Sequence, residues 1–263
     1  MTMKTAPLFI IASCSLCALA QEKAPSSAKI HRDAAGRPDL SGIWQGIGVS
    51  LFGETGEVRP GEGRASTWGP PPGPAPYQPW AAGRVKELAS DDRKDPNVQC
   101  KMAGTPRITG IPVPFEIAQT AKKTYILYES NHIYRIIPTD GRPHIPANIK
   151  LFQGDSVGHW EGDTLVVDTT NLSDRTWFDT VGNFHSDAEH VVERFTPVDS
   201  NTVIYEATVD DAKVLTKPFK MEMELDKSSD TKYEQMEFGC IEGNQDVKHY
   251  TKDKGGAADV KVK

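Results

Sequence analysis

One stretch constrains the fold of this chain more than any other, Gly158 to Thr170, with the sequence GHWEGDTLVVDTT. Gly162 stands where a tight turn requires a positive φ, which glycine adopts without a Cβ clash. The residues that follow, Thr164 to Thr169, are rich in β-branched side chains and have the length of a strand. The stretch therefore predicts a β-hairpin with its turn at Glu161-Gly162-Asp163.

The same design, two strand-like runs around a polar turn, recurs on both sides of this hairpin. No helical pattern lies between the runs, so a parallel α/β fold is disfavoured, and a closed antiparallel barrel would leave no exposed strand edge. We expect an all-β, mainly antiparallel, lipocalin-like barrel, built as a meander of about nine to eleven strands. The further pairs that we expect are 125–129 with 132–137, 191–195 with 203–209, and 219–225 with 233–238.

Two other elements complete the expected fold. Residues 54–79 form a long arm dense in proline and glycine, which cannot build a helix or a central strand and would wrap the barrel or act as a lid. Pro79 suits the first turn of a helix, and the run to Leu88 is the one short helix that we predict. Trp80, Arg84, Val85 and Leu88 are spaced to lie on one face of this helix.

The N-terminus has the pattern of an export signal. Lys4 precedes an apolar run that is too short to span a bilayer, and Ala18-Leu19-Ala20 fits a cleavage site before Gln21. An alternative is a bacterial lipobox that ends at Cys14, which would place a lipid anchor there. We therefore expect a signal peptide at 1–20, a flexible arm at 21–38, a single barrel domain at 39–250 and a disordered tail at 251–263. Either signal predicts a periplasmic or extracellular protein without a transmembrane segment.

Composition and cysteines narrow the function further. The formal charge of −6 and the lack of a basic patch argue against a nucleic-acid partner. The mature chain keeps Cys100 and Cys240, which predict one disulfide in an oxidising compartment, although two separate buried thiols are the alternative. Two cysteines disfavour a cysteine-based zinc site, and we expect no metal and no cofactor.

The densest group of ionisable residues is His185 to His190. His185, Asp187 and His190 are the candidate catalytic residues, as a general acid–base pair or part of a metal site, with His144 as a possible third partner. The separation of the two histidines gives them opposite parity along a strand, so a loop-to-strand transition would have to bring them together. The alternative is structural: His185 and Asp187 cap the loop and His190 packs in the barrel.

Both faces of the expected strands mix apolar and ionisable residues, so some charges would point into a polar cavity, where they must be paired. Arginines could clamp a carboxylate or phosphate there, or they could form ion pairs with neighbouring acids. The candidate ligand-binding residues are Arg107, Arg135, His144, Trp160 and Arg194.

Four blocks carry a resemblance to a known family: 39–44 (DLSGIW), 140–144 (DGRPH), 158–169 (GHWEGDTLVVDT) and 185–195 (HSDAEHVVERF). They are similar to a large family of secreted bacterial proteins of unassigned function, and the similarity runs from about Asp39 to Asn244. It implies an exported, β-rich domain and no particular activity. Separately, Gly42-Ile43-Trp44 resembles the Gly-x-Trp opening of lipocalin-like (calycin) barrels, where the tryptophan closes one end.

The sequence favours an exported barrel that binds a small organic molecule, anionic or hydroxyl-rich, in its interior. The alternatives are a cofactor-independent lyase, isomerase or hydrolase that uses the His/Asp pair, and a structural envelope protein.

Overall fold

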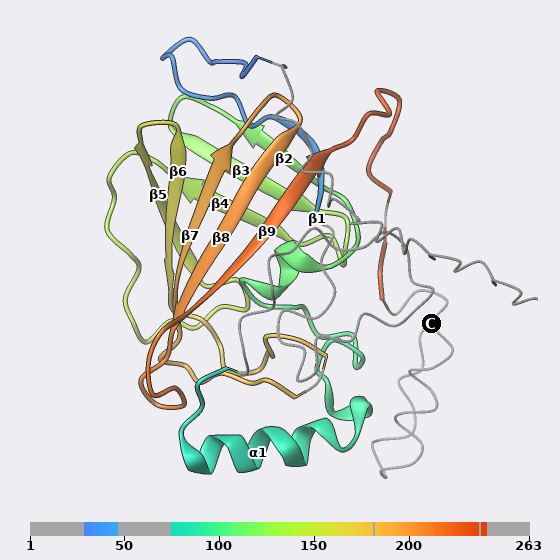
Figure 1. Cartoon of the computed structure of the whole chain (residues 1–263), viewed down its shortest axis with the longest axis vertical. Coiled ribbons are helices and arrows are strands. Elements are labelled where there is room, and N and C mark those ends of the chain that lie inside the picture. The colour runs from blue at the N-terminus through green and yellow to red at the C-terminus, as the bar shows by residue number, and fades with distance from the viewer. Residues whose placement is uncertain (1–28, 47–74, 181, 237, 241–263) are drawn as a thin grey trace, which may run out of the picture.

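The computed structural model describes residues 29–46, 75–180, 182–236 and 238–240, which form a nearly closed antiparallel β-barrel (Figure 1). The predicted signal peptide, the lipid anchor at Cys14, most of the proline-rich arm and the tail at 251–263 lie outside the described residues.

The described residues hold nine strands in one sheet, with the order β4-β3-β2-β1-β9-β8-β7-β6-β5 and antiparallel pairing throughout. Strand β1 pairs with both β2 and β9, so the start and the end of the meander lie side by side. The all-β barrel prediction is confirmed. The strands are β1 (Gly42–Gly46), β2 (Phe115–Gln119), β3 (Lys123–Tyr128), β4 (Tyr134–Pro138), β5 (Asp155–Glu161), β6 (Thr164–Thr170), β7 (His190–Pro197), β8 (Thr202–Asp210) and β9 (Phe219–Lys227).

The central hairpin forms as predicted. Strands β5 and β6 pair from Asp155 opposite Thr170 to Glu161 opposite Thr164, and Gly162 has φ +59° in the turn. A glycine is favoured there because side chains strain a left-handed backbone.

The predicted pairing of 219–225 with 233–238 is wrong. Strand β9 pairs with β1 instead, because the strand that carries the buried Trp44 supplies the edge that closes this side of the barrel. Residues 233–236 and 238–240 cross the β3–β4 turn, where Gln235 Nε2 donates to the Leu127 carbonyl at 2.7 Å. The predicted disulfide Cys100–Cys240 is present and anchors this crossing segment to the segment before β2.

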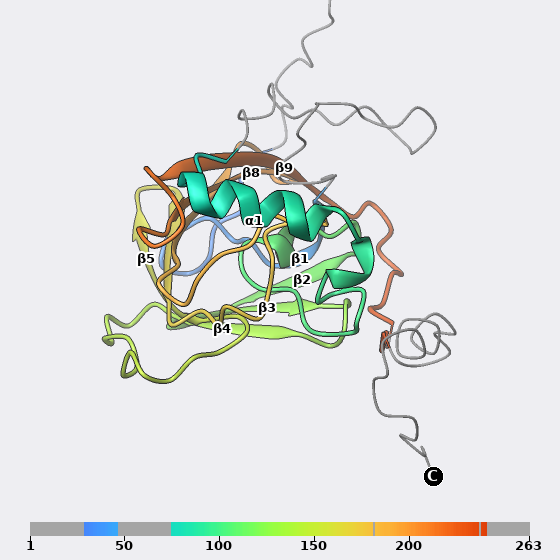
Figure 2. The ribbon, with the colours of Figure 1, turned by 90° about the horizontal axis from the view of Figure 1, so that it is seen from below.

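Helix α1 (Pro79–Ala89) lies across one end of the barrel (Figure 2), and two short 3-10 turns, η1 (Asp92–Lys94) and η2 (Arg107–Gly110), follow it. Its buried residues are Ala81, Val85 and Leu88, which share one helical face at spacings of four and three. Of the four residues that their spacing groups together, Val85 and Leu88 are buried, whereas Trp80 and Arg84 are exposed. The indole packs beside Phe184 on the outside, and Trp80 is 57% exposed.

The inward-facing side chains fill the barrel. Tyr205, Phe115 and Phe195 are among the largest fully buried ones, and Phe195 and Tyr205 contact each other edge to face at 5.0 Å. Strands β4 and β5 lie against each other without ladder pairing, and Gly158 of β5 permits this close approach. A Cβ at Gly158 would lie 2.8 Å from Ile137 Cγ2 of β4.

Side chains close this seam. Arg135 of β4 reaches across it and donates to Ser156 Oγ of β5 at 2.9 Å and to Thr169 Oγ1 of β6 at 3.2 Å. Hydrogen bonds that backbone pairing provides elsewhere in the barrel are thus replaced by those of one buried guanidinium.

Candidate functional site

The outer face of β5, β6 and β7 carries a group of histidines and carboxylates. The register places Asp168 opposite Val157 and Val192, and His190 lies two positions along β7 from Val192, on the same face. Asp168 and His190 are therefore diagonal neighbours on one face, within reach of each other. His190 Nε2 lies 3.0 Å from Asp168 Oδ2.

A second imidazole reaches the same carboxylate from the loop between β4 and β5. His144 Nε2 lies 2.9 Å from Asp168 Oδ1, and His144 Nδ1 lies 2.9 Å from Asp155 Oδ2. Arg142 of the same loop binds Asp155 through both terminal nitrogens, at 3.0 and 2.7 Å. We call Arg142, His144, Asp155, Asp168 and His190 the outer cluster.

The outer cluster is open to solvent on one side and anchored on the other. The side chain of His190 is 42% exposed, that of Asp168 is 37% exposed and that of His144 is 26% exposed. Asp155 is buried, which by itself disfavours its charge, but Arg142, His144 and the Ile145 amide hold its pKa below its usual value. The anchored carboxylate thus stays ionised beneath the accessible groups.

This arrangement suits proton transfer and polar recognition. An ionised carboxylate only accepts hydrogen bonds, so His144 can satisfy Asp155 and Asp168 together when both of its ring nitrogens carry a proton. Asp168 also fixes the orientation of His190, which leaves the Nδ1 of that exposed ring to meet a bound molecule.

His185 lies away from the outer cluster, in the interior. Its Nε2 lies 2.6 Å from Thr176 Oγ1, and its Nδ1 lies 2.8 Å from Glu189 Oε2, although neither oxygen of Glu189 has a hydrogen-bond partner among the described residues. Burial opposes the charged imidazole, but Glu189 and the Ser186 carbonyl outweigh it and raise the pKa of His185. The pKa of Glu189 is also raised, in this case by burial itself, because burial disfavours the charged carboxylate.

Asp187 is placed apart from both histidines, on the surface, where it pairs with Lys213 Nζ at 2.5 Å. The structure therefore does not bring His185, Asp187 and His190 together. It does bring His190 and His144 together, through Asp168.

Two of the candidate arginines are buried in ion pairs. Arg135 donates to Glu193 at 2.9 and 2.5 Å, and Tyr205 Oη donates to the same carboxylate at 2.9 Å. Arg107 binds Asp95 through two bonds at 2.8 and 2.7 Å. The prediction that charges point into the barrel in pairs is thus confirmed for Arg135 and Glu193.

The other two candidate ligand residues lie nearer the surface. Arg194 is on the outer face of β7 and donates to Glu161 at 2.9 Å. Trp160 is partly buried against the core, and the Arg37 guanidinium lies 5.8 Å from its ring centroid.

The sequence did not single out Asp155 or Asp168 as site residues. A signal for Asp168 was available, since an acidic residue directly after the apolar run Leu165 to Val167, in the same strand, must face away from the core or be paired. Asp155 gave no such signal, because its role depends on how the loop that carries Arg142 and His144 folds back.

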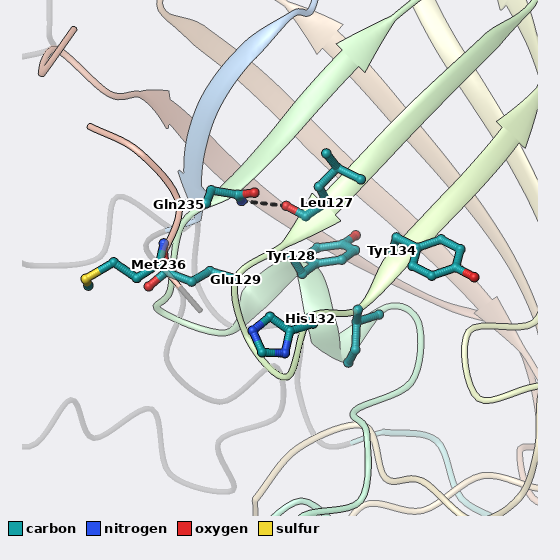
Figure 3. A pocket seen from close by; sticks show the side chains of 8 residues that line it. Leu127, Tyr128, Glu129, His132, Tyr134, Gln235 and Met236 are labelled. Carbon is teal, nitrogen blue, oxygen red and sulfur yellow. Dashed lines mark hydrogen bonds between the residues drawn. The ribbon is translucent and has the colours of Figure 1, made fainter. Parts of the chain in front are cut away.

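A separate hollow of about 460 Å³ lies beside the β3–β4 turn (Figure 3). It is lined by Leu127, Tyr128, Glu129, His132, Ile133, Tyr134, Gln235 and Met236. His132 has φ +52° in this turn, a left-handed conformation that is uncommon for a residue with a side chain.

Among the described residues, no group of three or more His, Cys, Asp or Glu is arranged to hold a metal ion. No helix in that part of the chain is long and apolar enough to cross a membrane. Comparison with protein-family models, curated proteins and solved structures found no match to this chain.

Proposed function

We propose that the protein is an exported β-barrel that binds a small polar molecule, anionic or hydroxyl-rich, at the outer cluster. The observation that carries this proposal is the convergence of His144 and His190 on the half-exposed Asp168. Such a group offers donors and acceptors to a guest while Asp155 and Arg142 hold it in place.

We assign the guest to the outer cluster and not to the barrel interior. Inside, Arg135 and Glu193 bind each other, and large side chains such as Tyr205 and Phe195 occupy the space around them. A guest there would have to displace a buried ion pair, which is strongly unfavourable.

Export is part of the proposal. The disulfide Cys100–Cys240 supports an oxidising compartment, and the signal pattern and the family resemblance point the same way. The burial of Trp44 supports a lipocalin-like relationship. Intact-mass analysis of exported protein tests the signal: we expect a chain that begins at Gln21, and a diacylated Cys14 would instead show a lipoprotein.

The test of binding is a titration of the mature protein with a panel of small carboxylates and sugars, followed by saturation-transfer NMR. For each binder, we expect Asp168→Asn to weaken affinity by about tenfold or more, because it removes the charge that holds both imidazoles. Asp163→Asn is the matched control, since Asp163 lies in the same hairpin and pairs with Arg32 away from the outer cluster. Equal effects of the two substitutions would contradict the proposal.

A second candidate function is acid–base catalysis, favoured by the Asp168–His190 contact at 3.0 Å, in which a carboxylate orients an exposed imidazole. A lyase or isomerase of this kind removes a proton next to a carbonyl. Loss of such protons from keto acids in D2O, followed by NMR, would reveal the activity, and His190→Gln should abolish it while binding persists. No exchange above the rate in buffer would exclude this function and leave a binding protein; if no guest binds either, the outer cluster is structural.

A further inference from the structure

Trp80 is a large apolar side chain held in a fixed position in solvent. Its indole Nε1 donates to Gln78 Oε1 at 3.1 Å, and its ring lies 6.1 Å from that of Phe184 at an angle of 59°. Phe184 in turn stacks on Tyr77, with centroids 5.8 Å apart. Trp80 is thus an exposed aromatic side chain whose orientation is set by its hydrogen bond to Gln78 and its ring contact with Phe184.

A hollow of about 590 Å³ lies between the start of α1 and the connection from β8 to β9, and its lining includes Gln78 and Pro79, the two residues that precede Trp80. Its walls combine charged and hydroxyl groups with proline rings. The lining residues that could bind a guest through polar side-chain atoms are Asp210, Thr216 and Lys217.

The hollow is built on backbone hydrogen bonds. The Gln78 amide donates to the Val214 carbonyl at 2.8 Å, and the Thr216 amide donates to the Pro76 carbonyl at 2.8 Å. Gln78 Nε2 also donates to the Ala212 carbonyl at 3.0 Å. These bonds fix the walls before a ligand arrives. Binding therefore costs little conformational entropy in the protein.

The hollow adjoins the outer cluster. Asp210, in its wall, is the direct partner of His190 in the β7–β8 ladder, so the two side chains lie on one face of neighbouring strands. One extended molecule could therefore reach both places.

We propose that this hollow binds a neutral oligosaccharide, with one sugar ring stacked on Trp80. A sugar ring has a face of C–H groups, which suits an exposed indole, and an edge of hydroxyls, which suits alternating donors and acceptors such as Asp210, Thr216 and Lys217. The opposite charges of Asp210 and Lys217 give no preference for a charged ligand. Sugar binding in the hollow does not depend on the proposed function. Only an extension of the sugar to His190 rests on that function.

The test is calorimetric titration of the mature protein with cellohexaose, maltohexaose, chitohexaose and xylohexaose. At least one should bind saturably, and Trp80→Ala should weaken that binding by about tenfold or more, whereas Trp80→Phe should lose less. Lys217→Met should weaken it by about threefold to tenfold. Tyr134→Ala is the matched control, because Tyr134 is also strongly exposed but lies on β4, outside this hollow.

The outcomes separate this inference from the proposed function. Loss of binding in Trp80→Ala but not in Asp168→Asn would support the hollow and count against the outer cluster, and loss in both would support one continuous site. Saturable binding to none of the four sugars below about 10 mM, or equal affinity of Trp80→Ala and the parent protein, would overturn the inference. If Trp80→Ala does not fold, Trp80→Phe and Lys217→Met decide by the same criteria.

Discussion

Strands β6 and β7 carry two polar groups on opposite faces, and these groups differ in what they can do. Thr169 and Glu193 point inward to Arg135, whereas Asp168 and His190 point outward to His144. Asp168 and Thr169 are neighbours in sequence, so a single step along the strand separates the two groups.

Burial decides the difference between them. Inside, burial opposes the charge of Arg135, but Glu193 and Tyr128 raise its pKa. Arg135 therefore stays charged, and its guanidinium bonds across the β4–β5 seam. Outside, solvent reaches His190 and Asp168, and their bonds can be exchanged for bonds to a guest at little cost. The interior group therefore supports the barrel, and the outer cluster remains available for binding.

The largest expected effect is from breaking the interior group. Arg135→Met keeps the length of the stem but leaves Glu193 buried without its cation, so we expect the free energy of unfolding in urea to fall by about 3–5 kcal/mol. Arg194→Met, on the outer face of β7, should cost less than about 1 kcal/mol. Equal losses from the two substitutions would contradict the distinction between the faces.

The next largest loss of stability is expected at Gly158 of β5, and its neighbour His159 provides the comparison. Gly158→Val places side-chain atoms against Ile137 at the seam, and we expect it to destabilise the protein by about 1–3 kcal/mol. His159→Val changes the solvent face and should stay within about 0.5 kcal/mol of the parent protein. Thermal unfolding of both variants measures this, and a stable Gly158→Val protein would show that the seam is looser than described.

The dependence of stability on pH should differ between the buried and the outer histidine–carboxylate groups. His185 and Glu189 both have raised pKa values, so their contribution is complete below their ordinary values and is lost as the pH rises through the raised ones. Asp155 has a lowered pKa, so its contribution is present above 3.8 and is lost as the pH falls through the lowered value.

Urea unfolding measured from acid to alkaline pH tests both predicted changes in stability. The stability of the parent protein should decline as the pH rises above 6.5, the ordinary pKa of His185, and His185→Gln should reduce that decline. Asp155→Asn should instead reduce the decline toward acid. An unchanged alkaline slope in His185→Gln would show that the buried pair does not titrate there.

The smallest effect on stability is expected from the outer histidines. His144→Gln and His190→Gln each remove a partly exposed partner of Asp168 and should lower the free energy of unfolding by about 1 kcal/mol or less. Chemical denaturation of each variant measures this. A loss as large as that of Arg135→Met would show that the outer cluster is structural.

The sequence predicted the barrel well because strand pairs and turns leave local signals. Gly162 and the β-branched run after it identify their hairpin without any knowledge of the rest. The pairing of β9 with β1 left no such signal, since it joins residues about 180 positions apart.

The site was predicted only in part for the same reason. His144 and His190 were selected as ionisable residues, but their meeting at Asp168 depends on strand register and on the loop after β4. The sequence interval from His185 to His190 suggested one group, and the structure divides it between the interior and the outer face.

The most direct test of the central claim is an NMR titration that follows the imidazole signals of all histidines while a binder from the carboxylate and sugar panel is added. The account predicts that the signals of His144 and His190 shift together along one binding curve, while those of His185 stay unchanged in the interior. His159, exposed on the same outer face but bonded to Glu161, should shift far less. Shifts confined to His159, or equal shifts of every exposed histidine, would contradict a binding site at Asp168.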